Sequence, residues 1–157
     1  MFTNQEFVVL DFETTGLSFT EDEIVEIGAV CIRNFVPVKE FHALVRPTKP
    51  ISQGAFEVNG ITDEMVADAP PLKEVLPRLI DFIGARTIVA HNAKFDMGFL
   101  QQAAKNILGR EFENSFVDTL TLSRRVFSFE SHSLTALAKE LKIEMTQAHR
   151  SMSDCAA

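Results

Sequence analysis

Two acidic residues, Asp11 and Glu13, follow directly after an apolar run at 7–10. Because side chains alternate across a strand, these two carboxylates point to one face and Phe12 points to the other. Two carboxylates that stay ionised in a mostly buried place need a cation between them, and hard divalent ions prefer such oxygen ligands. The pattern therefore indicates a divalent-metal site. The alternative is an acid pair that faces water and caps the turn at 14–16.

Two later segments add further groups of the same chemistry. Asp96 closes the segment HNAKFD, which follows a second apolar run at 87–90, and the segment HRSMSD near the end places Asp154 five residues after His149. Asp96 alone would be an ordinary acid in the first turn of a helix, and Asp154 alone would be a solvated acid. Their order after the first acid pair favours one shared site.

In these segments the chain resembles the histidine branch (DEDDh, or DnaQ-like) of the DEDD exonuclease superfamily. The resemblance runs from about Phe7 to the last residue and includes IVEIGAV at 24–30 and VNGIT at 58–62. It is closest to the proofreading exonucleases of bacterial DNA polymerase III, both the epsilon-subunit type and the domain built into Gram-positive replicative polymerases. The other DEDD branch uses a tyrosine near the last acid. This chain contains no tyrosine, so only His149 can fill that role.

The resemblance implies two divalent metal ions, Mg²⁺ or Mn²⁺, held by four carboxylates. Asp11, Glu13 and Asp154 are expected to hold the first ion, Asp11 to bridge to the second, and Asp96 to act through bound water. Two ions roughly 3.5–4 Å apart can activate a water, stabilise charge on the phosphate and help the 3′ oxygen to leave.

His149 is the candidate general base, because an unperturbed imidazole pKa of about 6.5 suits removal of a proton from water near neutral pH. Five residues along a regular helix rotate the side-chain direction by about 140°. His149 and Asp154 therefore cannot both face one site from one helix, and we expect His149 in the loop just before the last helix.

The turn after the acid pair is expected to bind the end of the substrate, since a glycine turn lets backbone N–H groups approach a ligand closely. The resemblance implies contact with the terminal 3′ hydroxyl there and a base against the leucine that follows. Phenylalanine can stack on any base, although most of the 14 Phe must be core residues. The expected substrate-binding residues are Thr14, Thr15, Gly16, Leu17, Phe56, Val58, Asn59, His91, Asn92 and Phe95. For His91, bonding of the strand-to-helix turn is an equal alternative.

The remaining acids and histidines receive structural interpretations. Glu26 lies in an apolar strand run and is expected to be satisfied by a neighbouring backbone or hydroxyl group. Asp118 is expected to cap a helix. Neither is assigned as a metal ligand. His42 is expected on a strand surface, and His132 near a helix start.

The elements that must position these residues alternate along the chain. Strands are expected at about 6–11, 24–33, 38–45, 87–91 and 115–118. Helical segments are expected at about 54–58, 63–67, 71–84, 93–106, 119–128 and 133–141, with a final helix from about Arg150. Asn34 is placed in the first hairpin turn, Asn92 at a helix N-cap, and Ser131 or Ser133 at another. A hairpin followed by alternating strands and helices indicates an α/β protein with a mixed sheet flanked by helices. The resemblance implies a ribonuclease H-like fold with five strands.

Composition limits the class of protein. With 157 residues and 46% hydrophobic content, one compact domain over residues 1–157 is expected. The net charge of −7 argues against a module that coats nucleic acid with a basic surface, although it would also serve solubility alone. The sequence shows no secretion signal, membrane-length apolar run or lipidation motif, so a cytoplasmic location without membrane contact is expected. Family members continue the last helix well past its acid. Here three residues follow, so the chain is either truncated in that helix or has a short tail.

The sequence thus predicts a metal-dependent 3′→5′ exonuclease that releases nucleoside 5′-monophosphates from the 3′ end of single-stranded DNA. Proofreading beside a replicative DNA polymerase is the expected setting. One alternative is a 3′→5′ exoribonuclease of the same branch, which the motifs do not separate. The other is a catalytically inactive interaction module, against which the intact acids and His149 argue.

Overall fold

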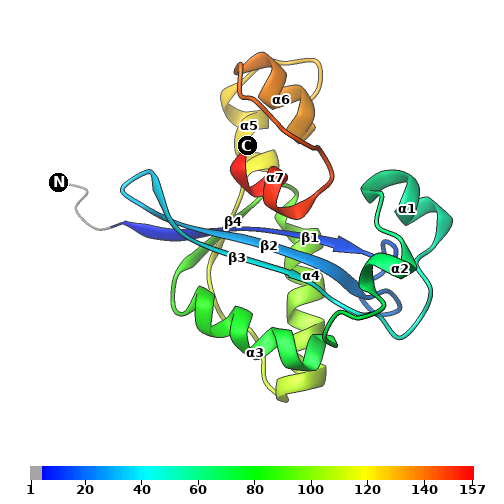
Figure 1. The fold of residues 1–157 in the computed structure, drawn as a ribbon. Helices are drawn as coiled ribbons and strands as arrows, with labels where there is room; N and C mark the ends of the chain where they lie inside the picture. The colour runs from blue at the N-terminus through cyan, green and yellow to red at the C-terminus, as the bar shows by residue number, and fades with distance from the viewer. Residues whose placement is uncertain (1–4) are drawn as a thin grey trace.

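The computed structural model describes residues 5–157. A five-stranded sheet with the order β3-β2-β1-β4-β5 lies at its centre (Figure 1). The strands are β1 (Glu6–Thr14), β2 (Ile24–Arg33), β3 (Val36–Leu44), β4 (Thr87–Ala90) and β5 (Phe116–Asp118). β2 pairs antiparallel with both β1 and β3, whereas β4 pairs parallel with both β1 and β5. The sheet is therefore mixed, as expected.

Helices cover both faces of this sheet (Figure 1). They are α1 (Gln53–Asn59), α2 (Asp63–Val66), α3 (Leu72–Ile83), α4 (Ala93–Ala103), α5 (Thr119–Val126), α6 (Leu134–Glu140) and α7 (Ser151–Ala156). α3 and α4 lie on one side, and α5, α6 and α7 lie on the other, while α1 and α2 sit at one end (Figure 1). Among the described residues, no helix is both long and apolar enough to cross a lipid bilayer.

The main core explains which face of β1 carries the acids. Val8, Leu10 and Phe12 are buried in one cluster with the apolar stripes of α3 and α4. Burial of each large side chain is worth about 1.5–3 kcal/mol, so this face of the strand is strongly specified. The alternating residues Asp11 and Glu13 are thereby turned toward the opposite face, where α7 packs against β1 and β2.

Several boundaries differ from the expected ones. β1 runs to Thr14 rather than to residue 11, because Phe12 and Glu13 continue to pair with β2 before a bulge. The helix expected at 93–106 ends at Ala103 and continues as a π turn over Ala104–Leu108. The strand expected at 38–45 begins two residues earlier, directly after a turn in which Asn34 has a φ of 51°.

The cap assignments are only partly confirmed. Ser133 caps α6, and Asp118 caps α5 through Leu120 N at 3.1 Å. Asn92 occupies the N-cap position of α4, but its φ of 60° is left-handed and its side chain makes no capping bond. Asp118 Oδ1 instead accepts a hydrogen bond from Ala93 N at 3.1 Å. One aspartate therefore joins the starts of α4 and α5.

Candidate active site

Three carboxylates from two elements meet on the face of the sheet that carries α7. Asp11 and Glu13 come from β1, and Asp154 comes from the first turn of α7. One oxygen atom of each lies within 4.8 Å of the others. Asp11 Oδ2 is buried and has no hydrogen-bond partner among residues 5–157. Clustered carboxylate oxygens, one of them unpartnered, fit a hard divalent cation.

The acids raise one another's pKa values while no cation lies between them. Burial, followed by the charge of Asp154, raises the pKa of Glu13 to about 8. Burial and the charges of Asp96 and Glu13 hold the pKa of Asp11 well above its usual range. Burial also raises the pKa of Asp154, an effect that nearby His149 partly offsets. A divalent cation would favour the ionised forms and reverse these shifts.

Asp96 lies beside this cluster rather than inside it. β4 stops pairing with β1 at Val9, so the N–H of Phe12 has no strand partner on that side. Asp96 Oδ1, from the first turn of α4, accepts this N–H at 3.0 Å. The side chain is almost fully buried, and burial raises its pKa. The structure therefore brings all four predicted acids to one place, with Asp96 fixed by a backbone contact.

His149 lies in the turn before α7, as the five-residue spacing predicted. Its side chain is exposed, its φ is 58°, and its backbone N–H donates to Asp154 Oδ1 at 3.2 Å. A hollow of about 650 Å³ is lined by His149, Asp11 and Asp154 together with His91 and Asn92. The candidate base and the acid cluster therefore open onto the same space.

Glu26 has partners that sequence reasoning missed. Its carboxylate accepts a fork of hydrogen bonds from Arg150 Nε and Nη2, at 2.7–3.2 Å, and one from Ser151 N at 3.1 Å. His42 Nε2 lies 2.9 Å from Glu26 Oε1. The expected backbone partner is present, but the main partner is a guanidinium rather than a hydroxyl. Burial favours the neutral acid, yet these hydrogen bonds outweigh it and lower the pKa of Glu26 to about 2.

This contact fastens α7 to the sheet. Glu26 lies directly opposite Glu13 in the β1–β2 register, and Arg150 and Ser151 are the first residues of the α7 turn. Two residues along β2, a Cβ on Gly28 would collide with the backbone of Ser151. α7 thus approaches the sheet closely at a glycine and is held by the Glu26–Arg150 ion pair, which places Asp154 over β1.

A second pocket adjoins the acid cluster. It has a volume of about 450 Å³ and lies between the turn after β1 and helix α1. Of the expected substrate-binding residues it is lined by Thr14, Gly16, Leu17, Val58, Asn59 and Phe95. Glu13 lines it as well, which connects it to the carboxylates. Leu17 is 86% exposed and Val58 is 58% exposed, so apolar side chains are available at its mouth.

Other expected substrate-binding residues lie elsewhere or make internal contacts. Thr15 is buried and bonds within its own loop, and Phe56 does not line this pocket. The Asn59 amide donates to Thr14 O at 3.3 Å and its oxygen accepts from Ile61 N at 2.9 Å. His91 contacts Thr119 Oγ1 at 3.0 Å and His132 O at 2.9 Å, so the turn-bonding alternative describes its contacts.

The fold and the site together define a class of protein. A mixed five-stranded sheet with helices on both faces and a carboxylate cluster on its central strand is the architecture of a ribonuclease H-like nuclease. The RNase_T family model, described as Exonuclease, matches residues 8–157. The chain belongs to this exonuclease family, and the resemblance noted from its motifs is confirmed.

Two relatives and two solved structures show how far the likeness extends. The chain is 42% identical over 153 residues to the DNA polymerase III PolC-type of Thermotoga petrophila and 42% identical over 155 residues to that of Bacillus subtilis. Each alignment covers 98% of this chain but 11% of the relative, so the chain spans about a tenth of the length of these proteins.

Exonuclease X, solved in complex with 5′ overhanging duplex DNA, superposes with a TM-score of 0.78 at 33% identity, over 96% of this chain and 84% of that one. Escherichia coli Exonuclease I, solved with a dT13 oligonucleotide, gives a TM-score of 0.85 at 19% identity, over 96% and 39% of the two chains. The second likeness shows the fold alone. The predicted ribonuclease H-like fold is confirmed.

Proposed function

We propose that this domain hydrolyses the last phosphodiester bond at the 3′ end of single-stranded DNA and releases a nucleoside 5′-monophosphate. The observation that carries the proposal is the cluster of Asp11, Glu13 and Asp154, whose carboxylate oxygens lie within 4.8 Å beside a pocket of about 450 Å³. The DNA complex of Exonuclease X, which is 33% identical to this chain, supports DNA as the substrate.

The cluster fits a divalent cation, and in this proposal the four carboxylates would hold two such ions, Mg²⁺ or Mn²⁺, which would supply electrostatic stabilisation of the charge that develops on the phosphate. Asp11, Glu13 and Asp154 would hold the first ion, with Asp11 shared and Asp96 acting through water. Because burial and mutual repulsion raise the pKa values of these acids, they gain most from the presence of cations.

The protein residues orient the two reactants. In this proposal Thr14, Gly16 and Leu17 hold the terminal nucleotide against α1, which directs its phosphate toward Glu13 and Asp11. His149 accepts the proton of the attacking water. The carboxylate of Asp154 accepts a hydrogen bond from the backbone N–H of His149 and lies close enough to feel the charge of its ring, so it would favour the imidazolium that results. Asn92 and His91 border the space in which this transfer takes place.

The setting is part of the same proposal. The relatives are named as DNA polymerase III of the PolC type, and this chain matches about a tenth of their length. We therefore propose that residues 1–157 act as one exonuclease domain that removes misincorporated nucleotides beside a replicative DNA polymerase in the cytoplasm.

The test uses matched single-stranded DNA and RNA oligonucleotides labelled at the 3′ nucleotide. With Mg²⁺ or Mn²⁺, DNA should lose its label as a mononucleotide, while EDTA and the Asp11→Asn variant should abolish release. A 3′ phosphate should block the reaction. Cleavage of closed circular single strands would overturn the proposal, and faster release from RNA than from DNA would assign the domain to RNA ends instead.

A further inference from the structure

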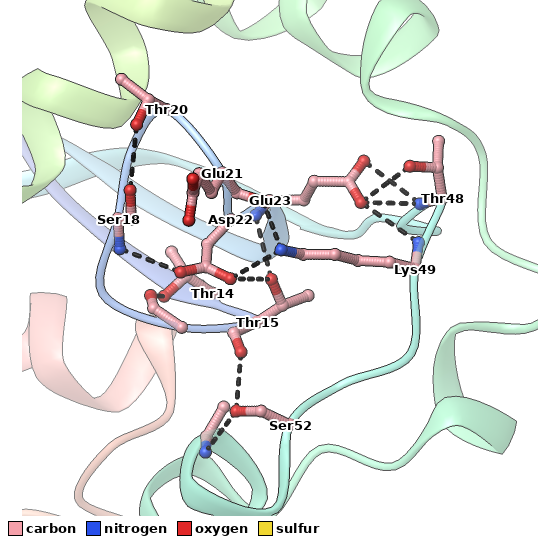
Figure 2. A network of polar contacts seen from close by, with 12 residues as sticks. Thr14, Thr15, Ser18, Thr20, Glu21, Asp22, Glu23, Thr48, Lys49 and Ser52 are labelled. Carbon is pink, nitrogen blue, oxygen red and sulfur yellow. Dashed lines mark hydrogen bonds and ion pairs between the residues drawn. The ribbon is translucent and has the colours of Figure 1, made fainter.

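The two ends of the loop between β1 and β2 are joined by hydrogen bonds. Thr15 N donates to Glu23 O at 2.8 Å, and Glu23 N donates back to Thr15 Oγ1 at 3.0 Å. Figure 2 shows the loop, which carries Thr14, Thr15 and Ser18 on one limb and Asp22 and Glu23 on the other. The turn that lines the nucleotide pocket is therefore one limb of a closed loop.

Asp22 occupies the inside of this loop. Its carboxylate accepts hydrogen bonds from Ser18 N at 2.9 Å and from Thr15 Oγ1 at 3.2 Å, and it pairs with Lys49 Nζ at 2.9 Å (Figure 2). The Lys49 ammonium, with the Ser18 N–H, lowers the pKa of Asp22. Since Lys49 is partly exposed, this ion pair alone fixes little, and the bonds to Ser18 and Thr15 define the loop's shape.

Gly16 is required because of Asp22. A Cβ at residue 16 would collide with the Asp22 carboxylate. Gly16 does not have a positive φ, so a glycine is needed here for space rather than for a left-handed backbone. The backbone of the pocket-lining turn thus rests directly against this carboxylate, and any displacement of Asp22 changes the position of Gly16 and Leu17.

The opposite wall of the pocket is tied to the same loop. The Glu23 carboxylate accepts hydrogen bonds from Thr48 N at 2.9 Å and Lys49 N at 3.2 Å. Three residues later, Ser52 Oγ donates to Thr15 O at 2.8 Å and accepts from Ala55 N at 3.1 Å, which makes it the N-cap of α1 (Figure 2). One hydroxyl therefore joins the start of α1 to the turn that faces it.

We propose that Asp22 and Ser52 are positioning residues that hold the two walls of the pocket at a fixed separation, so that the 3′-terminal nucleotide enters a preformed site. Neither residue belongs to the acid cluster or touches the reacting atoms. The inference rests on the proposed function, because it requires that this pocket take the terminal nucleotide. A preformed pocket avoids the entropy of ordering a loop on binding, so the loss of either residue should weaken binding rather than slow the chemistry.

The experiment compares KM and kcat for release from a single-stranded DNA 3′ end in Asp22→Ala, Asp22→Asn and Ser52→Ala. We expect KM to rise about tenfold in Asp22→Ala and Ser52→Ala, with kcat within about twofold of the unmodified domain, since the cost of ordering a loosened pocket falls on binding rather than on the chemical step. Thr62→Ala is the matched control. Thr62 caps α2 through Met65 N at 3.3 Å and makes no described contact with the loop, so its KM should not change.

A double substitution sharpens the test. Gly16→Ala alone should raise KM because the added methyl group collides with Asp22. In the Asp22→Ala background the same change should add little, so the two effects should be far from additive. Anisotropy of a labelled oligothymidylate, measured in the inactive Asp11→Asn background, checks the binding losses without cleavage.

Three results are distinguishable. Unchanged KM and unchanged affinity in folded Asp22→Ala and Ser52→Ala domains would overturn the inference while leaving the exonuclease function intact. A fall in kcat alone would show a loss of folded protein rather than of pocket geometry, and would also count against it. Absence of cleavage by the unmodified domain would instead defeat the proposed function, and the anisotropy series would still decide whether Asp22 shapes the pocket.

Discussion

The loop beside the nucleotide pocket is held at many points, whereas the turn that carries His149 is held at few. Asp22, Glu23 and Ser52 connect both limbs of the first loop to each other and to α1. His149 is exposed, has a left-handed backbone, and precedes a helix of six residues. The start of that helix is held to the sheet by the Glu26–Arg150 ion pair and by close packing against Gly28.

This difference suggests a division of labour around one cluster of acids. In the proposed function the pocket side binds a chain end without rearrangement, so damage there should appear in KM. In the proposed mechanism the His149 side supplies a proton acceptor from an exposed turn and one carboxylate from α7, so damage there should appear in kcat. Five measurements test this difference between the pocket side and the His149 side.

Loss of an acid from the cluster should have the largest effect, because both sides depend on it. Asp11→Asn should lower the rate of nucleotide release at least 10³-fold, since metal stabilisation of the phosphate is worth several kcal/mol and each 1.36 kcal/mol is tenfold. The metal-free variant should melt higher than the unmodified domain, because repulsion in the cluster is relieved. Asp81→Asn, an exposed acid on α3, is the control and should change neither. Near-normal cleavage by Asp11→Asn would end the metal-ion interpretation.

His149→Ala tests the catalytic side alone. We expect kcat to fall about 10²-fold or more, the range for a lost general base, with KM nearly unchanged. Added imidazole should restore part of the rate by replacing the missing proton acceptor. A variant with lost affinity and normal turnover would place His149 on the binding side and remove the contrast.

Arg150→Ala tests what holds the His149 turn. Removing one partner of a buried ion pair typically costs about 3–5 kcal/mol, because the other charge stays buried. We expect a lower melting temperature, weaker Mn²⁺ binding through Asp154, and a kcat reduced roughly tenfold, since a misplaced catalytic group loses at least that much. Arg150→Lys should recover only part, because an ammonium cannot form the two-pronged contact.

The control for this prediction is Arg33→Ala. Arg33 pairs with Glu6 at the far end of β1, where both side chains are partly exposed. An exposed ion pair is worth about 0–1 kcal/mol, so stability and kcat should barely move. Equal losses in the two variants would show that Arg150 has no particular connection to the active site.

The first acid pair and the five strands could be predicted because their signals are local. Asp11 and Glu13 are recognised from residue type and spacing, and each strand is an apolar run between turn residues. Asp154 is distant in sequence and was assigned to the cluster only through the family resemblance. The end of β1 could not be predicted, since the strand continues as long as β2 pairs with it. Asn92 occupies the predicted N-cap position of α4, but its side chain does not make the capping bond. Asp118, which lies 25 residues after Ala93, accepts the Ala93 N–H in its place.

The contacts that hold the site together could not be predicted from the sequence. Glu26 and Arg150 are 124 residues apart, and nothing in their local sequence indicates that they meet. Asp22 and Ser52 carry a faint signal, an acid after a glycine turn and a serine before a helix. Only the folded chain shows that Asp22 rests on Gly16 and that Ser52 reaches Thr15.

The pH dependence of stability should separate the acid cluster from the ion pair that holds α7. The pKa of Glu13 is raised to about 8, so its stabilising protonation is complete below the unfolded value of about 4.3 and is lost as the pH rises through 8. Asp11, Asp96 and Asp154 shift in the same direction. Glu26 has the opposite sign, and its contribution is present above about 4.3 and is lost as the pH falls toward 2.

The metal-free domain should therefore melt at progressively lower temperature between pH 5 and pH 8. Glu13→Gln should flatten this decline, and saturating Mg²⁺ should remove most of it, because bound cations favour the ionised acids. Thermal scans in EDTA and in Mg²⁺ at several pH values measure the difference. A melting temperature that rises with pH in EDTA would mean that the acids are not in mutual repulsion.

Leu17→Ala should have the smallest effect on activity, and that effect should fall on KM alone, as expected of a residue that only binds substrate. Leu17 is 86% exposed, so its truncation should leave the free energy of unfolding within about 0.5 kcal/mol. If a terminal base packs on it, loss of about 1 kcal/mol of apolar contact should raise KM roughly fivefold at constant kcat.

Phe35→Ala is the control, because Phe35 is 82% exposed at the tip of the β2–β3 hairpin and does not line the pocket. A KM that rises equally in both variants would trace the effect to general surface hydrophobicity. A kcat that falls in Leu17→Ala alone would show that the pocket also aligns the phosphate for attack, so that binding and chemistry would be joined at this residue.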